Sequence, residues 1–353
     1  MWLKEPFRAP EFPRRVVWVN SEPLSFDQRH GVWLIQFWDY TDVACMRTLP
    51  YLAEWHRRYA DKGLTIVGVH TPRFGFAHQR HLVEWALREF GIEYPVLLDN
   101  YHRLWRAYGN DCWPTQYLID AGGRVRYVHL GSGRYDEAET AIHLLLRELE
   151  PPLDLPPIMR AVRPEDEPGT LCYPATPDLY AGYERGRFGD LDGYVYDHTV
   201  MYEDPGQREE GVLYAQGQWH TTCDYLAFMG EEGYLAFTYR AAGVNAILSP
   251  TWDKMALMLR LRERPVPQVR IWLDGCPLPS ADAGADIGYD CAGRSFVAID
   301  RPRLFSLTCH PRFGLHELRL TFRKRDATVY TVTFVSRMWP RCDEPRAQSL
   351  LMR

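Results

Sequence analysis

The sequence contains no pair of cysteines separated by two residues, although it has eight cysteines in total. Such a pair is the usual signature of a dithiol redox centre or a zinc ribbon, so the spacing argues against both. We therefore expect no metal and no bound cofactor. Single cysteines fit a reducing cytoplasm, whereas an even number also permits disulfides in an exported protein. They lie at positions 45, 112, 172, 223, 276, 291, 309 and 342.

Long apolar runs and excess positive charge are also missing. Nothing approaches about 18 consecutive apolar residues, so we expect no membrane-spanning helix. The first ten residues lack the apolar segment of a signal peptide, which favours a cytoplasmic location, or an extracytoplasmic one if this sequence is part of a longer protein. The formal net charge of −5 argues against a nucleic-acid partner, which would need a basic surface.

The chain has 353 residues, of which 46% are hydrophobic, so it can build the cores of two domains. Repeated prolines between residues 151 and 178 disfavour a helix and indicate a semi-extended linker. We predict a first domain at 1–150, this linker at 151–178, a β domain at 179–340 and a tail at 341–353.

The first domain is organised around one apolar run that leads into a helix. Val32–Trp38 is interrupted only by Gln36, as expected for a strand covered on both faces. Apolar residues then recur at helical spacing, and a lone thiol, Cys45, falls in the first helical turn. Asp42 stands at the predicted N-cap, where its carboxylate would accept a hydrogen bond from the amide of Cys45.

This strand and helix resemble the thioredoxin superfamily, and most closely its TlpA/DipZ-type thiol-disulfide oxidoreductases. The resemblance covers roughly residues 10 to 150 and implies an α/β thioredoxin-like fold. Further segments that look like this branch follow in the expected order, namely Leu64–Pro72, Tyr94–Asn100, Tyr108–Asn110, Trp113–Thr115, Tyr117–Asp120 and Gly123–His129.

The sequence departs from the family at the catalytic turn. The family carries Cys-x-x-Cys there, whereas this chain reads Asp42-Val-Ala-Cys45. Disulfide exchange needs an attacking thiolate and a second thiol that resolves the mixed disulfide, and Cys45 occupies only the second position. Thioredoxins often carry a buried acid on the central strand, where this chain has Gln36. A carboxylate beside Cys45 also disfavours its thiolate, so we expect a poor nucleophile.

The resemblance also implies a substrate groove beside the turn. A cis-proline, here Pro114, would face Cys45 in a groove where an extended peptide pairs. Cys112 precedes this proline by two residues and is an alternative resolving thiol, although strand alternation points it away from Cys45. The residues assigned to the groove are Trp38, Trp113, Pro114 and Thr115.

Beyond the linker, short β-branched and aromatic runs alternate with turn residues, which predicts an all-β jelly roll or β-sandwich. The segment Tyr180–Gly186 resembles the start of the C-terminal domain of DipZ-type proteins, a jelly roll similar to carbohydrate-binding modules. The predicted strands are Val212–Ala215, Tyr225–Met229, Tyr234–Tyr239, Gly243–Leu248, Val269–Leu273, Ser295–Ile299, Leu304–Leu307, Glu317–Phe322 and Val329–Val335.

The β domain offers candidates but no assigned site. Three of its tryptophans, at 219, 252 and 272, are able to stack on sugar rings, although tryptophans of a sandwich more often lie in the core. Isolated His and Cys residues near positions 220 and 310 lack the second spaced pair that a zinc site requires. A carbohydrate therefore remains only a possible partner of this domain.

Three functions are compatible with these observations. The first is a degenerate oxidoreductase that is weak, works as a monothiol with a protein thiol partner, or binds peptides without redox chemistry. The second is a peroxidase that uses Cys45, because peroxiredoxins share the fold and place their reactive cysteine near this turn. The third is a non-enzymatic two-domain protein that binds a carbohydrate or a protein.

Overall fold

The computed structural model describes residues 1–28, 30–190, 193–251, 253, 266–323 and 327–338. The chain divides into two compact units, Met1–Gly169 and Thr170–Arg353, and each is described by itself.

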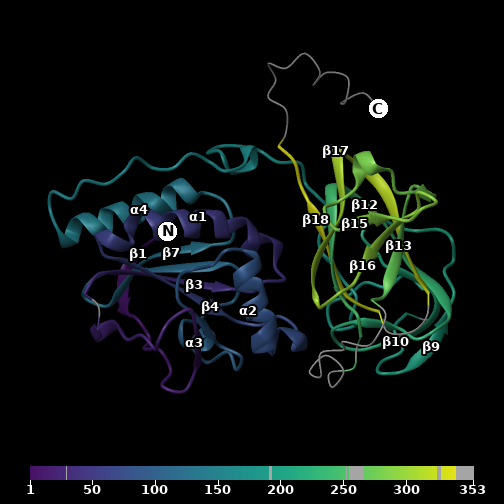
Figure 1. The fold of residues 1–353 in the computed structure, drawn as a ribbon, viewed down its shortest axis with the longest axis horizontal. Helices are drawn as coiled ribbons and strands as arrows, with labels where there is room; N and C mark the ends of the chain where they lie inside the picture. The colour runs from purple at the N-terminus through teal and green to yellow at the C-terminus, as the bar shows by residue number, and fades with distance from the viewer. Residues whose placement is uncertain (29, 191–192, 252, 254–265, 324–326, 339–353) are drawn as a thin grey trace, which may run out of the picture. The chain divides into compact units, whose positions relative to one another are not determined.

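The first unit is built on a seven-stranded sheet with β3 at its centre (Figure 1). Strand β3 runs parallel to β4 and antiparallel to β6, and all seven of its residues are buried. The strand order is β1-β7-β6-β3-β4-β5-β2. The strands are β1 Trp2–Arg8, β2 Val17–Val19, β3 Val32–Trp38, β4 Leu64–His70, β5 Val96–Leu98, β6 Thr115–Ile119 and β7 Arg124–Leu130.

Helices cover both faces of this sheet. In Figure 1, α1 and α4 lie together on one side of the strands and α3 lies on the other. The alternate residues Trp33, Ile35 and Phe37 of β3 pack with Leu104 and Trp105 of α3, which explains the continuous apolar run. The helices are α1 Val43–Tyr59, α2 Arg80–Glu89, α3 Arg103–Ala107 and α4 Tyr135–Leu149, with 3₁₀ turns at Phe26–Gln28, Ala60–Lys62, Gly75–His78 and Pro164–Asp166.

The α/β thioredoxin-like fold expected from the sequence is thus confirmed. Among the described residues, no helix combines the length and apolar character needed to cross a bilayer.

The segment that follows α4 is fastened to the first unit. The Tyr51 hydroxyl of α1 donates to Asp166 over 2.9 Å, and the Met159 amide donates to buried Glu139 of α4 over 2.9 Å. Residues 151–169, predicted as part of a linker, therefore lie against the helices of the first unit.

The second unit contains one eleven-stranded sheet, ordered β15-β16-β13-β17-β12-β10-β11-β18-β8 with β9 and β14 paired at its side. Its one 3₁₀ turn among the described residues is Ser280–Asp282. The strands are β8 Leu179–Tyr180, β9 Thr199–Tyr202, β10 Tyr214–Thr221, β11 Leu226–Phe228, β12 Glu232–Ser249, β13 Gln268–Leu273, β14 Cys276–Pro277, β15 Ile287–Tyr289, β16 Ser295–Ala298, β17 Arg303–Arg323 and β18 Thr328–Val335.

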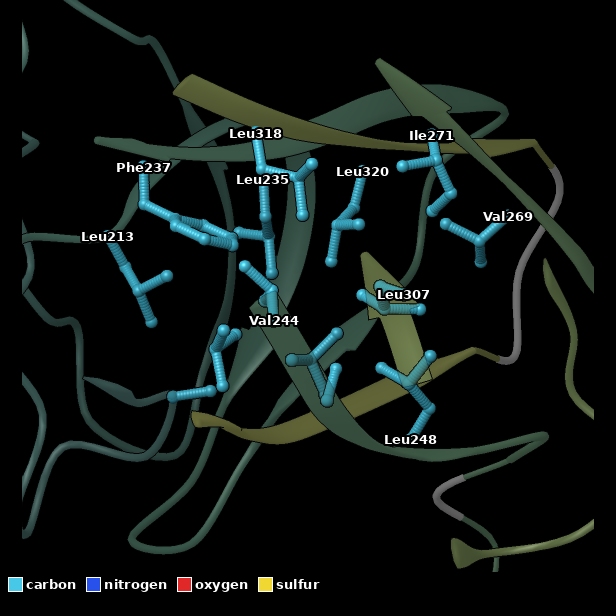
Figure 2. Close-up of a cluster of buried hydrophobic side chains, with 14 of the residues drawn as sticks. Leu213, Leu235, Phe237, Val244, Leu248, Val269, Ile271, Leu307, Leu318 and Leu320 are labelled. Atoms are coloured by element: carbon cyan, nitrogen blue, oxygen red, sulfur yellow. The ribbon is translucent and has the colours of Figure 1, made fainter. Parts of the chain in front are cut away.

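The sheet folds over its own core. Figure 2 shows apolar side chains such as Phe237, Leu320 and Ile271 pointing toward Val244 and Leu248, with the core between them. The long strands β12 and β17 supply residues on both sides of this core. A β-sandwich is therefore confirmed for the second unit, and the finer assignment as a jelly roll stays a prediction.

Candidate functional site

The turn before α1 is fixed by Asp42. This residue has extended backbone dihedrals (φ −92°, ψ 120°), and its Oδ1 accepts a hydrogen bond of 2.9 Å from the backbone amide of Cys45. The carboxylate is therefore the N-cap that the sequence predicted, an interaction that stabilises a helix by about 1 kcal/mol.

The other oxygen of Asp42 forms an ion pair that the sequence analysis missed. Arg73, three residues after β4, places Nη1 2.5 Å from Asp42 Oδ2, and only 7% and 13% of the two side chains are exposed. The guanidinium also lies 5.7 Å from the centre of the Trp113 ring and 5.8 Å from that of Phe74. Burial raises the pKa of Asp42, and the charge of Arg73 opposes that shift. A buried cation and anion thus lie together at the turn before α1.

A second missed residue, Asp39, joins the two loops at this edge of the sheet. Its Oδ1 accepts from the Thr41 amide at 2.6 Å, and its Oδ2 accepts from the Arg73 amide at 2.7 Å. The parallel pairing of β3 with β4 was a usable signal, because the residues that follow parallel neighbours meet at one edge. Asp39 therefore holds Arg73 in position beside Asp42.

Cys45 is inaccessible at this site. Its side chain is 0% exposed, and burial, reinforced by the charge of Asp42, raises the pKa of the thiol well above its ordinary value. The effect of the Asp42 carboxylate was expected from the sequence. A thiolate is the reactive form of cysteine, so both effects disfavour reaction at Cys45.

Gln36 lies on the central strand β3 of the first unit. Its side chain is 0% exposed, and neither its amide nitrogen nor its oxygen has a hydrogen-bond partner among the described residues. An amide does not titrate, so Gln36 cannot serve as the proton acceptor that a resolving cysteine uses.

The predicted groove residues differ in their access to a ligand. The Trp113–Pro114 bond is cis, and the half-buried Trp113 donates its indole N–H to Thr71 O at 3.1 Å. Trp38 and Thr115 are 0% exposed, and Pro114 is buried. Trp113 is therefore the one predicted groove residue with surface that a ligand can touch in this structure.

Cys112, the proposed alternative resolver, is a free thiol like Cys45. Its Sγ lies 3.4 Å from Thr115 Oγ1, and its carbonyl accepts from that hydroxyl at 2.9 Å. Burial raises the pKa of the Cys112 thiol, but by less than it raises that of Cys45. No disulfide joins the two cysteines in the structure.

The tryptophans of the second unit have different positions. Trp219 is 0% exposed and packs edge-on against Phe228 and Phe322, so it belongs to the core as the sequence favoured. Trp272 is half-buried on β13, whereas position 252 lies outside the described residues.

The histidines considered as metal ligands pair with side chains instead. His310 lies 2.9 Å from Asp282 through Nδ1 and 2.8 Å from the Tyr239 hydroxyl through Nε2, and His316 lies 2.8 Å from Asp274. Across the described parts of the chain, no group of three His, Cys, Asp or Glu residues is arranged to hold a metal ion.

Comparison with known families assigns both units. The Redoxin family matches residues 9–142, and the family described as "Thioredoxin like C-terminal domain" matches residues 176–334. Residues 9–142 form a thioredoxin-like domain of the redoxin type. The relatives of this domain include thiol-disulfide oxidoreductases.

Individual relatives cover different parts of the chain. Protein DipZ of Mycobacterium bovis is 30% identical over 249 residues, which is 69% of this chain but 35% of DipZ, so the chain spans about a third of that relative. Thiol-disulfide oxidoreductase YkuV of Bacillus subtilis is 28% identical over 42% of this chain and 100% of its own length. A crystal structure of a thiol-disulfide isomerase from Corynebacterium glutamicum is 24% identical, covers 39% of this chain and 96% of its own, and has a TM-score of 0.35.

Proposed function

We propose that the redoxin-like domain binds an extended segment of a protein partner and does not catalyse disulfide exchange. The ion pair between Asp42 and Arg73 is the observation that carries this proposal. It takes the position of the attacking thiol and leaves Cys45 without a redox partner at the turn. Removing one partner of such a buried pair costs about 3 kcal/mol or more, because the other charge is left buried and unpaired.

The burial of Cys45 also favours binding over chemistry. Exchange and peroxide reduction both require a thiolate that the second reactant can reach. Cys45 is fully buried and has a raised pKa, which disfavours the monothiol and peroxidase alternatives together.

The backbone beside Pro114 supports a peptide ligand. In the described structure, the backbone N–H and C=O of Trp113 have no hydrogen-bond partner, although the neighbouring Pro114 carbonyl accepts from Gly131. An extended peptide can pair with such open groups as an added strand while its side chains contact the Trp113 ring. A protein segment with an accessible backbone is therefore the proposed ligand class.

Replacing Trp113 by alanine should weaken peptide binding. The probe is carboxymethylated insulin B chain, which is extended and has no thiol to exchange, and its binding is measured by calorimetry with the full chain. We expect a loss of affinity of about 10-fold or more, typical for removal of an aromatic contact residue. Trp2→Ala is the matched control, because Trp2 is 42% exposed on β1. Equal affinity of both variants, or no binding by the parent chain, would contradict the proposal.

Cys45 should resist alkylation in the folded protein. Cys309 is exposed and provides an internal reference for the reaction with N-ethylmaleimide, followed by mass spectrometry of peptides. We expect Cys45 to react at least about 100-fold more slowly than Cys309, because labelling requires opening of the domain. The difference should vanish in urea. A comparable rate at Cys45 with a midpoint near pH 6 would instead support a reactive thiolate.

A further inference from the structure

One hollow on the surface of the second unit is lined by several arginines. It encloses about 330 Å³ over the outward face of the four neighbouring strands β10, β12, β17 and β13. This volume is at the lower end of the range for small-molecule sites. Its charged lining consists of three arginines and one glutamate, Arg270, Arg319, Arg323 and Glu232.

The strand register places these side chains on one face. Arg319 pairs with Trp272 across the ladder of β17 and β13, and Thr321 pairs with Arg270 one step further. Their neighbours Leu318 and Leu320 are fully buried in the core, so alternation along β17 directs Arg319 and Thr321 away from the core. The arginines are therefore gathered on one surface by the register itself.

Arg319 is the central residue of this hollow. Its guanidinium lies 5.2 Å from the centre of the Trp272 ring and 5.3 Å from that of Tyr234. It forms no ion pair with any described residue. A guanidinium held between two rings keeps its planar N–H edge oriented, and that edge fits a carboxylate through two parallel hydrogen bonds.

The two flanking arginines are only weakly neutralised. Arg323 lies 3.5 Å from Glu232, but 60% and 68% of these side chains are exposed, so the pair contributes little. Arg270 lies 3.8 Å from Asp290, at the outer limit of an ion pair. The hollow therefore contains the guanidinium of Arg319, which has no ion pair with a described residue, and at least one further arginine that is free enough to bind an anion.

Polar groups and bare backbone complete the lining. Gln216 and Thr321 supply an amide and a hydroxyl, and Gly233 forms part of the wall. A Cβ atom on Gly233 would approach the Gln216 carbonyl oxygen to 2.4 Å, so glycine is required by this close packing.

We propose that this hollow binds a small organic dicarboxylate. One carboxylate pairs with the edge of Arg319, and the second lies toward Arg323 and displaces its contact with Glu232. The aromatic rings of Tyr234 and Trp272 shield the first pair from water on two sides. The size of the hollow favours a small molecule over a polymer, and the second arginine, Arg323, favours a ligand with two anionic groups.

Calorimetry with the full chain tests this assignment, with glutarate as the probe and acetate, inorganic phosphate and an oligoglutamate peptide as comparisons. We expect sub-millimolar binding of glutarate, at least about 10-fold weaker binding of acetate, and weaker binding at high salt. Arg319→Lys keeps the charge and the ring contacts but loses the planar pair of N–H donors, so it should weaken glutarate binding about 10-fold or more. Arg312→Lys, an exposed position on the same strand, should leave it unchanged.

Several results would overturn the proposal. No heat with glutarate up to about 20 mM would show that the hollow takes no such ligand. Tighter binding of phosphate would contradict the carboxylate assignment, and tighter binding of the peptide would contradict the small-molecule assignment. Equal effects of the two lysine variants would place the binding elsewhere on the chain. The melting temperature of each variant shows whether it is folded.

Discussion

Replacing Asp42 by cysteine should give the redoxin-like domain a reversible disulfide and an insulin reductase activity that the parent chain lacks. The parent chain should reduce insulin with dithiothreitol at the background rate, because its single thiol at the turn is buried. Positions 42 and 45 are the N-cap and the third residue of α1, and a hydrogen bond of 2.9 Å already joins their groups. In this fold, that spacing otherwise holds two cysteines within bonding distance.

Arg73 should lower the pKa of the new thiol at position 42. Its guanidinium lies 2.5 Å from Asp42 in the parent chain, so in the variant it faces the cysteine. A neighbouring cation and a helix N-terminus both lower the pKa of a thiol. We therefore expect the thiol at position 42 to have a pKa below the ordinary value of about 8.5, and to be the attacking group. Gln36 should keep the activity modest, because no internal base assists Cys45.

The measurement is a glutathione redox titration of the Asp42→Cys variant, read by mass shift after alkylation, together with insulin turnover. Asp42→Ser is the matched control, because serine preserves the cap and removes the carboxylate without adding a thiol. The control should remain inactive. A variant whose two thiols stay reduced under oxidising glutathione would show that Asp42 does not stand at the attacking position.

The thioredoxin-like half of the fold was predictable because its signals are local. Val32–Trp38 is one nearly continuous apolar run, and the apolar residues of α2 recur at helical spacing. The cap of Asp42 was predictable for the same reason, since its partner lies three residues away. The role of Arg73 was not predictable from a local pattern. Its partner Asp42 lies 31 residues away, and only the pairing of β3 with β4 brings the two residues together.

The second unit shows the limit of local patterns more clearly. Two pairs of predicted strands proved to be single long strands, β12 and β17, which continue through an irregular register near Gly243. A Cβ on Gly243 would lie 2.7 Å from the Thr308 carbonyl oxygen, so this glycine marks close packing of the two strands and not a turn. In a sequence, a glycine inside an apolar pattern is compatible with either a turn or close packing of two strands. Only the structure of the partner strand distinguishes the two.

Acidification should destabilise the redoxin-like domain through two buried histidines, His70 and His129. Burial lowers the pKa of each to about 4. The unfolded chain takes up these protons near pH 6.5, whereas the folded domain resists them until about pH 4. The stabilisation from a neutral imidazole is therefore complete above pH 6.5 and is lost as the pH falls toward 4. By pH 4.5 each histidine should remove roughly 2 kcal/mol of the free energy of unfolding.

Phenylalanine at position 70 separates this effect from the titration of other groups. It retains a ring against Trp38 and Tyr40, whose centres lie 5.4 Å and 5.6 Å from that of His70, and it carries no titrating group. Urea unfolding followed by hydrogen exchange of β3 peptides reports on this domain alone. The difference in unfolding free energy between pH 7 and pH 4.5 should shrink by roughly 2 kcal/mol in His70→Phe and stay unchanged in His30→Phe, where the histidine is exposed. The same pH dependence in all three proteins would contradict the prediction. It would mean that His70 takes up a proton in the folded domain as readily as in the unfolded chain, so that burial does not lower its pKa.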